Sequence, residues 1–508
     1  MMNKRRCTMG LTRRAAALFR DTCRDGDRTP GFTAGSGASW HRPVPMARLP
    51  IFAPIFTKSH SVRRTLAGAL LAAAALTALP AQAQSILRDA ETEAFMADMS
   101  GPLVKAAGME PRNVQVLVIN DPEINAFVAG GQYVWVHSGL LAQADNVNQV
   151  QGVVAHELGH IEGGHIIRSG EGIKAATSVT LLSLVLGAAA IATGAGEAGM
   201  GIMGLGQQAA MSNFLAFSRA QESSADLAGA RYLHTAGISG RGSLEFFKKL
   251  QNQEYRLAIP QDNSYGRTHP LSGERINVLR EVYEVDPAWT KPVDPALETR
   301  FERIKAKLIG FVSEPTQTLQ KYPESDQSLP AHYARAYAWH KSAYPQKALD
   351  EADALLTALP HDPYFLELKG QILLESGRPK EAIAPLREAV KLTNQPLISV
   401  LLAHALIATE DESNFAEAEQ VLRIAVNRDR ENPFAWYQLG VVYERRGDTP
   451  RAALATAERY AMMGENQMAL RSADAAMQGL PQGTKDYLRA QDIAMVSRAA
   501  IEQKRKKR

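Results

Sequence analysis

The stretch Val153-Val154-Ala155-His156-Glu157-Leu158-Gly159-His160 decides how this chain is interpreted. Two histidines four residues apart lie on one face of a helix, close enough to share a metal ion. A carboxylate one residue after the first histidine lies beside the open coordination position, where it can take a proton from an activated water. We therefore predict a helix over 147–168 with His156 and His160 as zinc ligands and Glu157 as catalytic base.

A third ligand must come from elsewhere in the chain. Glu222 is the preferred candidate, because it lies on a separate predicted helix, and Asp226 follows one turn later, where it can orient a zinc-bound histidine from behind. His165 is off by one residue from the position that a third histidine ligand takes in the metzincin pattern, so we expect it behind the ligands or at the surface.

The hydrophobic pattern around this stretch predicts a mainly α-helical domain with a small β-sheet. A helix is expected over 85–109, a strand over 114–119, and two paired strands, 125–128 and 133–136, around Gly130-Gly131. A short helix is expected over 138–143, further helices over 214–237 and 274–285, and a proline-rich linker after that.

Residues 175–196 are apolar apart from small hydroxyl side chains, and the chain stays rich in glycine to Gly206. Three interpretations remain open: a membrane span, a mobile flap that contacts the membrane surface, and a buried core helix. The many glycines and alanines disfavour a rigid core helix, so the membrane-contacting flap is preferred.

An internal repeat begins near Leu329. Ala348, Ala382, Ala418 and Ala452 recur at intervals of 34, 36 and 34 residues, and Trp436-x-x-Leu439-Gly440-x-x-Tyr443 is the clearest unit. This pattern resembles the tetratricopeptide repeat, in which small residues let paired helices pack closely. Prolines at 363, 396 and 433 are expected at helix starts. A generic helical solenoid is the alternative, and either one stacks into a concave binding surface.

The front of the chain carries most of its basic excess. Residues 1–83 hold 13 Lys/Arg and 3 Asp/Glu, which leaves 44 basic and 50 acidic residues in the remainder, so a nucleic-acid partner is not indicated. Arg63-Arg64, an apolar run to Leu79 and Ala81-Gln82-Ala83 predict a secretory signal with cleavage near Ala83. A membrane anchor and twin-arginine export are alternatives. Met46 is a plausible start, and both cysteines, Cys7 and Cys23, precede the signal.

These motifs together resemble the HtpX-type gluzincin peptidases, and the repeats narrow the likeness to the periplasmic members that carry tetratricopeptide repeats. The likeness rests on the histidine stretch, Glu222-x-x-x-Asp226, Thr268-His269-Pro270 with Glu274-Arg275, and the Asn125-Ala126-Phe127 segment. It implies an α+β protease domain followed by an α-helical solenoid, with these parts: extension and signal 1–83, protease domain 84–290, linker helices 291–328, repeats 329–503 and a basic tail 504–508.

The resemblance also implies roles. His156, His160 and Glu222 bind one zinc ion, Glu157 is the base, and His269 either steadies the oxyanion or caps the zinc at rest. Arg219 or Arg267 supports the transition state, and the strand of Tyr133, Val134, Trp135 and Val136 offers an edge to an extended substrate. The expected activity is zinc-dependent endopeptidase action on misfolded or stalled outer-membrane proteins in the periplasm, with the repeats docking substrates or the outer-membrane assembly machinery.

Two other functions remain as alternatives. The chain could be a non-proteolytic chaperone or assembly factor with a structural or gated zinc site, although a structural site has no use for Glu157. It could also be an integral membrane protease, with 175–196 and the signal segment as spans. The tail from Lys504 to Arg508 is expected to be a solvated basic end that could contact anionic lipid or a partner.

Overall fold

We describe the chain from a computed structural model, which covers residues 85–193, 195–257, 269 and 273–506. Residues 82–508 form one compact unit by themselves. The expected signal segment and Arg267 lie outside the described residues.

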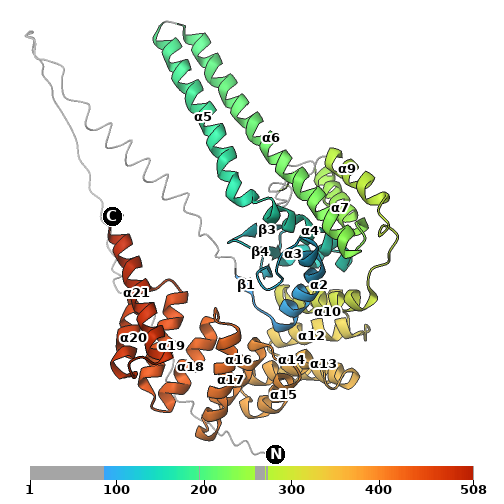
Figure 1. The fold of residues 1–508 in the computed structure, drawn as a ribbon. Helices are drawn as coiled ribbons and strands as arrows, with labels where there is room; N and C mark the ends of the chain where they lie inside the picture. Colours follow the sequence, from blue (N-terminus) through green and yellow to red (C-terminus); the bar gives the residue numbers. More distant parts are fainter. Residues whose placement is uncertain (1–84, 194, 258–268, 270–272, 507–508) are drawn as a thin grey trace, which may run out of the picture. The chain divides into compact units, whose positions relative to one another are not determined.

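The first part of this unit is a small sheet covered by helices (Figure 1). Its elements are β1 (Ile86–Leu87), α2 (Ala90–Ala106), β2 (Gln115–Ile119), β3 (Ala126–Ala129), β4 (Tyr133–His137), α3 (Ser138–Gln143), α4 (Val147–Glu162), α5 (His165–Ala192), α6 (Gly196–Ala236), α7 (Arg241–Leu257) and α9 (Gly273–Glu284).

The sheet has the order β1-β2-β4-β3. β1 pairs antiparallel with β2, β2 runs parallel to β4, and β3 pairs antiparallel with β4, with Phe127 opposite Trp135. The predicted hairpin around Gly130 and Gly131 is therefore present, and both glycines have positive φ angles of 69° and 99°. The expected helix over 85–109 begins only at Ala90, because Ile86 and Leu87 pair with β2 and Asp89 caps the helix by accepting from the Thr92 backbone N–H.

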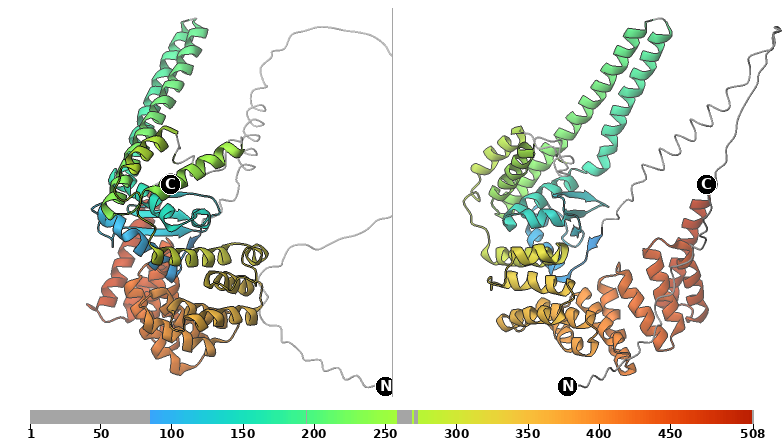
Figure 2. Two further views of the ribbon diagram at one scale, coloured as in Figure 1. Left: turned by 90° about the vertical axis from the view of Figure 1, so that its right-hand side faces the viewer. Right: turned by 180° about the vertical axis from the view of Figure 1, so that it is seen from behind.

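The helix that carries the histidine pair is shorter than expected. It ends at Glu162, not near residue 168, because Gly164 adopts a left-handed conformation with φ 59° and redirects the chain into α5. α5 and α6 then form a long antiparallel pair whose far ends extend away from the sheet (Figures 1 and 2). The Gly-rich stretch expected to be a flap is thus helical on both sides of residue 194.

Helix α10 (Pro295–Val312) joins the two parts of the unit. Phe301, Ile304 and Leu308 belong to the hydrophobic core of the sheet and its helices, so this core extends beyond the expected boundary at residue 290. On its other side, Arg303 makes a two-point contact with Asp362 at 2.6 and 2.7 Å. The region expected as a linker is therefore a packed element.

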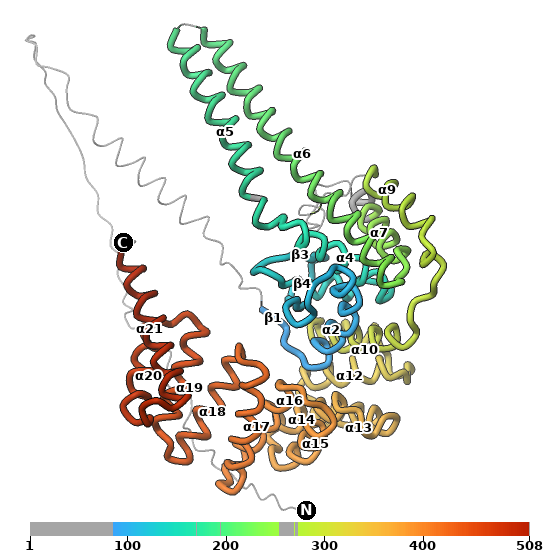
Figure 3. Tube along the Cα trace, in the orientation of Figure 1, coloured from blue at the N-terminus to red at the C-terminus, as the bar shows by residue number. Residues whose placement is uncertain are grey.

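The second part is a succession of antiparallel helix pairs (Figure 3). Its helices are α11 (Pro315–Lys321), α12 (Leu329–Lys341), α13 (Pro345–Ala358), α14 (Pro363–Glu375), α15 (Pro379–Leu392), α16 (Pro396–Ala408), the 3-10 helix η1 (Glu412–Asn414), α17 (Phe415–Arg428), α18 (Pro433–Arg445), α19 (Thr449–Met462), α20 (Asn466–Gly479) and α21 (Lys485–Lys506).

The repeat predicted from the alanine spacing matches these helix pairs. The four alanines at 348, 382, 418 and 452 are all buried, and the prolines at 363, 396 and 433 each start a helix. Gly377 and Gly447, both with φ 76°, turn one helix into the next. The expectation of a mainly helical fold with a small sheet and a following helical solenoid is confirmed.

Candidate metal centre

Helix α4 places two imidazoles side by side. Asn146 caps the helix through a 3.0 Å bond from the Gln149 backbone N–H, which sets the start of the helical register. One turn apart on the buried face, His156 and His160 bring their Nε2 atoms to 3.1 Å from one another. Both side chains are almost completely shielded from solvent. This is the arrangement that the four-residue spacing predicts.

Helix α6 brings a carboxylate across to the two histidines. The Oε1 atom of Glu222 lies 3.4 Å from His160 Nε2, and its Oε2 atom lies 3.4 Å from His156 Nε2. The close approach of α4 and α6 depends on Gly159, since a Cβ there would lie 2.6 Å from the carbonyl oxygen of Ala225. A glycine inside the histidine stretch therefore allows the second helix to supply its ligand.

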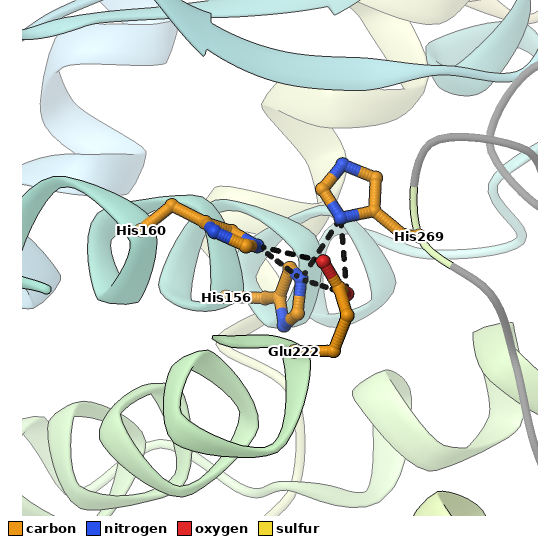
Figure 4. Close-up of side chains that lie close together, drawn as sticks. All are labelled: His156, His160, Glu222 and His269. Atoms are coloured by element: carbon orange, nitrogen blue, oxygen red, sulfur yellow. Dashed lines mark hydrogen bonds and ion pairs between the residues drawn. The ribbon is translucent and has the colours of Figure 1, made fainter. Parts of the chain in front are cut away.

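A third histidine completes the group. The Nδ1 atom of His269 lies 3.3 Å from His156 Nε2 and 3.2 Å from Glu222 Oε2 (Figure 4). One ligand atom from each of His156, His160, Glu222 and His269 lies within 4.8 Å of the others, and all four residues are buried. Three imidazole nitrogens and one carboxylate oxygen form a donor set that suits a tetrahedral divalent metal.

The charges within the cluster also suit a cation. Burial alone would lower the pKa of His156, but the hydrogen bonds that its ring donates to the Asp226 and Glu222 carboxylates outweigh burial and raise that pKa to about 10. Burial and the repulsion of His156 lower the pKa of His160 to about 2. The Glu222 carboxyl has a lowered pKa, because the contacts with His156 and His269 outweigh its burial. The buried carboxylates thus stabilise positive charge at this cluster, as a cation site requires.

The carboxylate of Glu157 lies beside this cluster. Its side chain is fully buried, and neither carboxylate oxygen accepts a hydrogen bond from any of the described residues. The Nε2 atom of His269 is 3.5 Å from Glu157 Oε1. Burial raises the pKa of this carboxyl group. A buried carboxylate without hydrogen bonds is costly, and a water molecule next to a metal ion would supply the missing donor.

A second layer of charged groups holds the ligands in place. The Oδ1 atom of Asp226 lies 2.8 Å from His156 Nδ1. The buried guanidinium of Arg275 donates to both Asp226 oxygens, at 2.7 and 2.8 Å, and its NH1 atom lies 3.1 Å from Glu222 Oε2. No role is predicted for Arg275 from the sequence, although the Glu274-Arg275 pair is part of the motif that resembles the family. The spacing of residues in the sequence does not show that α9 packs against the cluster and brings Arg275 to Glu222 and Asp226.

Two other predicted residues, His165 and Arg219, have definite places. His165 is buried, and its Nδ1 atom lies 2.9 Å from His160 Nδ1, so it lies behind a candidate ligand and not on the open surface. Arg219 is exposed on α6 and lines a shallow groove with Met211 and Leu215. Arg267 lies outside the described residues.

The predicted substrate edge is wrong as stated. The strand of Tyr133, Val134, Trp135 and Val136 is β4, which pairs with β2 on one side and β3 on the other, so its backbone groups are already used. β3 is the edge strand on this side of the sheet. It also lies next to the cluster, since His269 Nε2 is 3.3 Å from the carbonyl oxygen of Ala126. The sequence pattern predicts which segments are strands but not their order in the sheet, so it could not show that β4 lies inside the sheet.

A helix with two imidazoles one turn apart and a carboxylate next to them, completed by a glutamate from a second helix, is the arrangement of a metalloendopeptidase of the gluzincin type. Residues 86–283, which include the four clustered side chains, match the model of Peptidase family M48.

The chain resembles two bacterial proteases over different lengths. It is 25% identical over 375 residues to the Beta-barrel assembly-enhancing protease of Escherichia coli (strain K12), a match that covers 72% of this chain and 75% of that protein. It is 30% identical over 183 residues to Metalloprotease LoiP of the same organism, which covers 35% of this chain and 65% of that protein. Among solved structures, YrrB, described as a TPR protein with an unusual peptide-binding site, has a TM-score of 0.29 at 20% identity, covering 34% of this chain and 91% of that one.

Proposed function

We propose that this chain is a zinc-dependent endopeptidase of the bacterial periplasm that degrades misfolded or stalled outer-membrane proteins. The observation that carries the proposal is the buried cluster of His156, His160 and Glu222 with the carboxylate of Glu157 beside it, which accepts no hydrogen bond from the described residues. The likeness to the Beta-barrel assembly-enhancing protease supports the choice of substrate and compartment. In this proposal, residues 84–290 with the packed helix α10 hold the active site, and residues 329–503 recruit substrates or the outer-membrane assembly machinery.

Each residue of the cluster has a part in peptide hydrolysis. His156, His160 and Glu222 would hold one zinc ion, which supplies polarisation of the scissile carbonyl and a lowered pKa of the attacking water. Glu157 accepts the proton of that water as the new carbon–oxygen bond forms. It then delivers the proton to the amide nitrogen as the carbon–nitrogen bond breaks. Asp226 and Arg275 keep the ligands in position.

His269 is proposed to cap the site at rest. Its Nδ1 atom lies among the other ligand atoms, and its Nε2 atom faces both Glu157 and the carbonyl oxygen of Ala126 on β3. An extended substrate that pairs with the free edge of β3 would need the place that this imidazole occupies. Substrate binding and removal of the cap are therefore coupled in this proposal.

The test compares residues 82–508 with the Glu157→Gln variant, measuring zinc content and casein cleavage side by side. We expect both proteins to bind about one zinc ion and only the parent to cleave, because glutamine keeps the shape of the side chain but cannot accept a proton. Zinc binding by both without cleavage by either would favour the gated or chaperone alternative. Failure of both to bind zinc would refute the metal assignment.

A further inference from the structure

The outer parts of α5 and α6 form a hairpin, here defined as residues 175–218, with an unusual distribution of charge. Between Lys174 and Arg219 the only charged residue is Glu197, at the start of α6 near the turn. At the other end of the hairpin, Arg168, Glu171 and Lys174 on α5 and Arg219 on α6 bring several charges together. The hairpin thus has two uncharged arms above a charged base.

The arms pair through small residues. A Cβ on Gly206 would lie 1.9 Å from the Ser183 side chain, and one on Gly199 would lie 2.5 Å from the carbonyl oxygen of Gly187. Nearer the base, a Cβ on Gly172 would lie 2.5 Å from Phe217. Close contact of helices through glycine and serine is typical of helix pairs in membranes, where no hydrophobic force brings helices together and tight packing must do so.

The outer surface of the hairpin is apolar and exposed. Leu181, Leu182, Val185 and Leu186 on α5 are each more than half exposed, as are Met200 and Leu205 on α6. α5 is the one helix of the described residues that is long and apolar enough to cross a membrane. A continuous exposed surface of this kind marks an interaction site in a soluble protein.

The hydroxyl groups of residues 175–193 are bonded to carbonyl oxygens of the same arm. The hydroxyl groups of Thr177, Ser178 and Thr180 donate to the carbonyl oxygens four residues earlier, at 2.7, 2.8 and 3.0 Å. Ser183 and Thr193 donate to carbonyls three residues earlier. With its backbone groups bonded along the helix and its hydroxyl groups bonded to its own carbonyls, this arm requires no water.

We propose that the hairpin enters the hydrocarbon region of a lipid bilayer, with the leucine face of α5 among the acyl chains and the charged base at the head groups. From Lys174 to the end of α5 the arm rises about 27 Å at 1.5 Å per residue, close to the thickness of about 30 Å of a bilayer core. Gln207, Gln208 and Ser212 line one groove of α6, so these polar side chains of the hairpin lie on α6 and its leucine face lies on α5.

The hairpin is continuous with the metal centre. α6 runs without interruption from its exposed arm to Glu222 and Asp226, and Glu222 follows Arg219 of the base by less than one turn. At the foot of the other arm, His165 contacts His160. A bilayer that holds the hairpin therefore places the site within about 10 Å of the head groups. Given the proposed peptidase function, polypeptides at a membrane surface are the substrates that this position favours.

The first experiment is flotation of residues 82–508 with neutral phosphatidylcholine vesicles. This unit begins after the apolar run that ends at Leu79, so any binding comes from the folded part. We expect the parent to float, the L182K/V185K double variant to lose at least tenfold in partitioning, and M495K/V496K to float like the parent. The control pair is equally exposed, on α21. Neutral lipid prevents the lysines from gaining attraction to anionic head groups.

Depth and partner are then tested separately. Residues 82–508 contain no cysteine, so a single cysteine can carry the label. A fluorophore on Leu182→Cys is expected to be quenched by lipids brominated in the acyl chain, and one on Met495→Cys is not.

Parent protein that stays unbound, or an unquenched label at 182, overturns the proposal. The proposal is also overturned if the parent is a dimer in the absence of vesicles and L182K/V185K is a monomer, because a second copy of the chain then covers the apolar face of α5. Casein cleavage in solution should be equal in the parent and both lysine pairs, which separates this test from that of the peptidase function.

Discussion

The Nδ1 atom of His156 lies 2.8 Å from the Oδ1 atom of Asp226. This contact fixes the ring so that Nε2 points at His160, Glu222 and His269, the atoms that would share a metal ion. Asp226 in turn is held by the Arg275 guanidinium through two bonds. The orientation of a candidate ligand on α4 therefore depends on α6 and α9.

The Asp226→Asn variant tests this support. We expect zinc affinity to fall roughly 10- to 100-fold, because the amide no longer provides the negative charge that orients His156 and increases its basicity. Competition with a chelator of known affinity measures the change. The control is Asp286→Asn, which removes a carboxylate 2.7 Å from His234 Nδ1 at an exposed pair away from the cluster. Equal zinc affinity in the parent and Asp226→Asn would show that the contact has no role in metal binding.

Gly159 is expected to control the approach of α6 to α4. Gly159→Ala places a Cβ 2.6 Å from a backbone oxygen and 2.8 Å from a backbone Cα of Ala225, atoms that cannot move alone. We expect a loss of about 1–3 kcal/mol in stability and weaker zinc binding, since the helix that carries Glu222 must shift. Gly101→Ala on α2 is the matched control, because no atom lies within 4 Å of its Cβ. That variant should be neutral or more stable by up to about 1 kcal/mol.

The His269→Ala variant distinguishes the two roles considered for this residue. We expect zinc content to remain near one per chain, because three ligands are left, and basal casein cleavage to rise, because the imidazole no longer occupies the site. Zinc content by elemental analysis and initial cleavage rates are measured on the same preparation. Retained zinc with a slower rate would instead assign His269 to stabilisation of the oxyanion.

A pH effect on stability is expected from Glu367 on α14. Burial raises the pKa of this carboxyl to about 8, which the nearby Lys307 only partly offsets, and its Oε2 atom has no hydrogen-bond partner among the described residues. Below pH 4.5 the group is protonated in both folded and unfolded chains. Between about 4.5 and 8 the unfolded chain releases the proton and the folded chain keeps it, so stability falls as pH rises.

Glu367→Gln should remove this loss. We expect the Tm of the variant, relative to the parent, to increase from pH 5 to pH 8 and then to stay constant. Thermal unfolding of both proteins across this range measures the difference. Glu412→Gln, at an exposed position, serves as control and should follow the parent at every pH. A difference between Glu367→Gln and parent that does not change with pH would contradict the raised pKa.

Local sequence rules accounted for what lies within single elements. The four-residue spacing of His156 and His160 is a property of one helix, and the hairpin around Gly130 needs only two neighbouring strands. The repeat of buried alanines likewise reports on contacts between successive helices. In each case the interacting groups are close in sequence, so their relation follows from backbone geometry.

The tertiary structure decided the relations between distant elements. It placed β4 inside the sheet and β3 at the edge, brought Arg275 beneath Glu222 and Asp226, and packed α10 into the core of the first part. It also paired α5 with α6 into an exposed hairpin, where composition alone had left three interpretations open. Periodicity shows which face of an element is apolar, but strand order and helix pairing depend on how all such faces are buried together. The sequence thus determined the candidate metal ligands of α4, and only the fold determined what surrounds them.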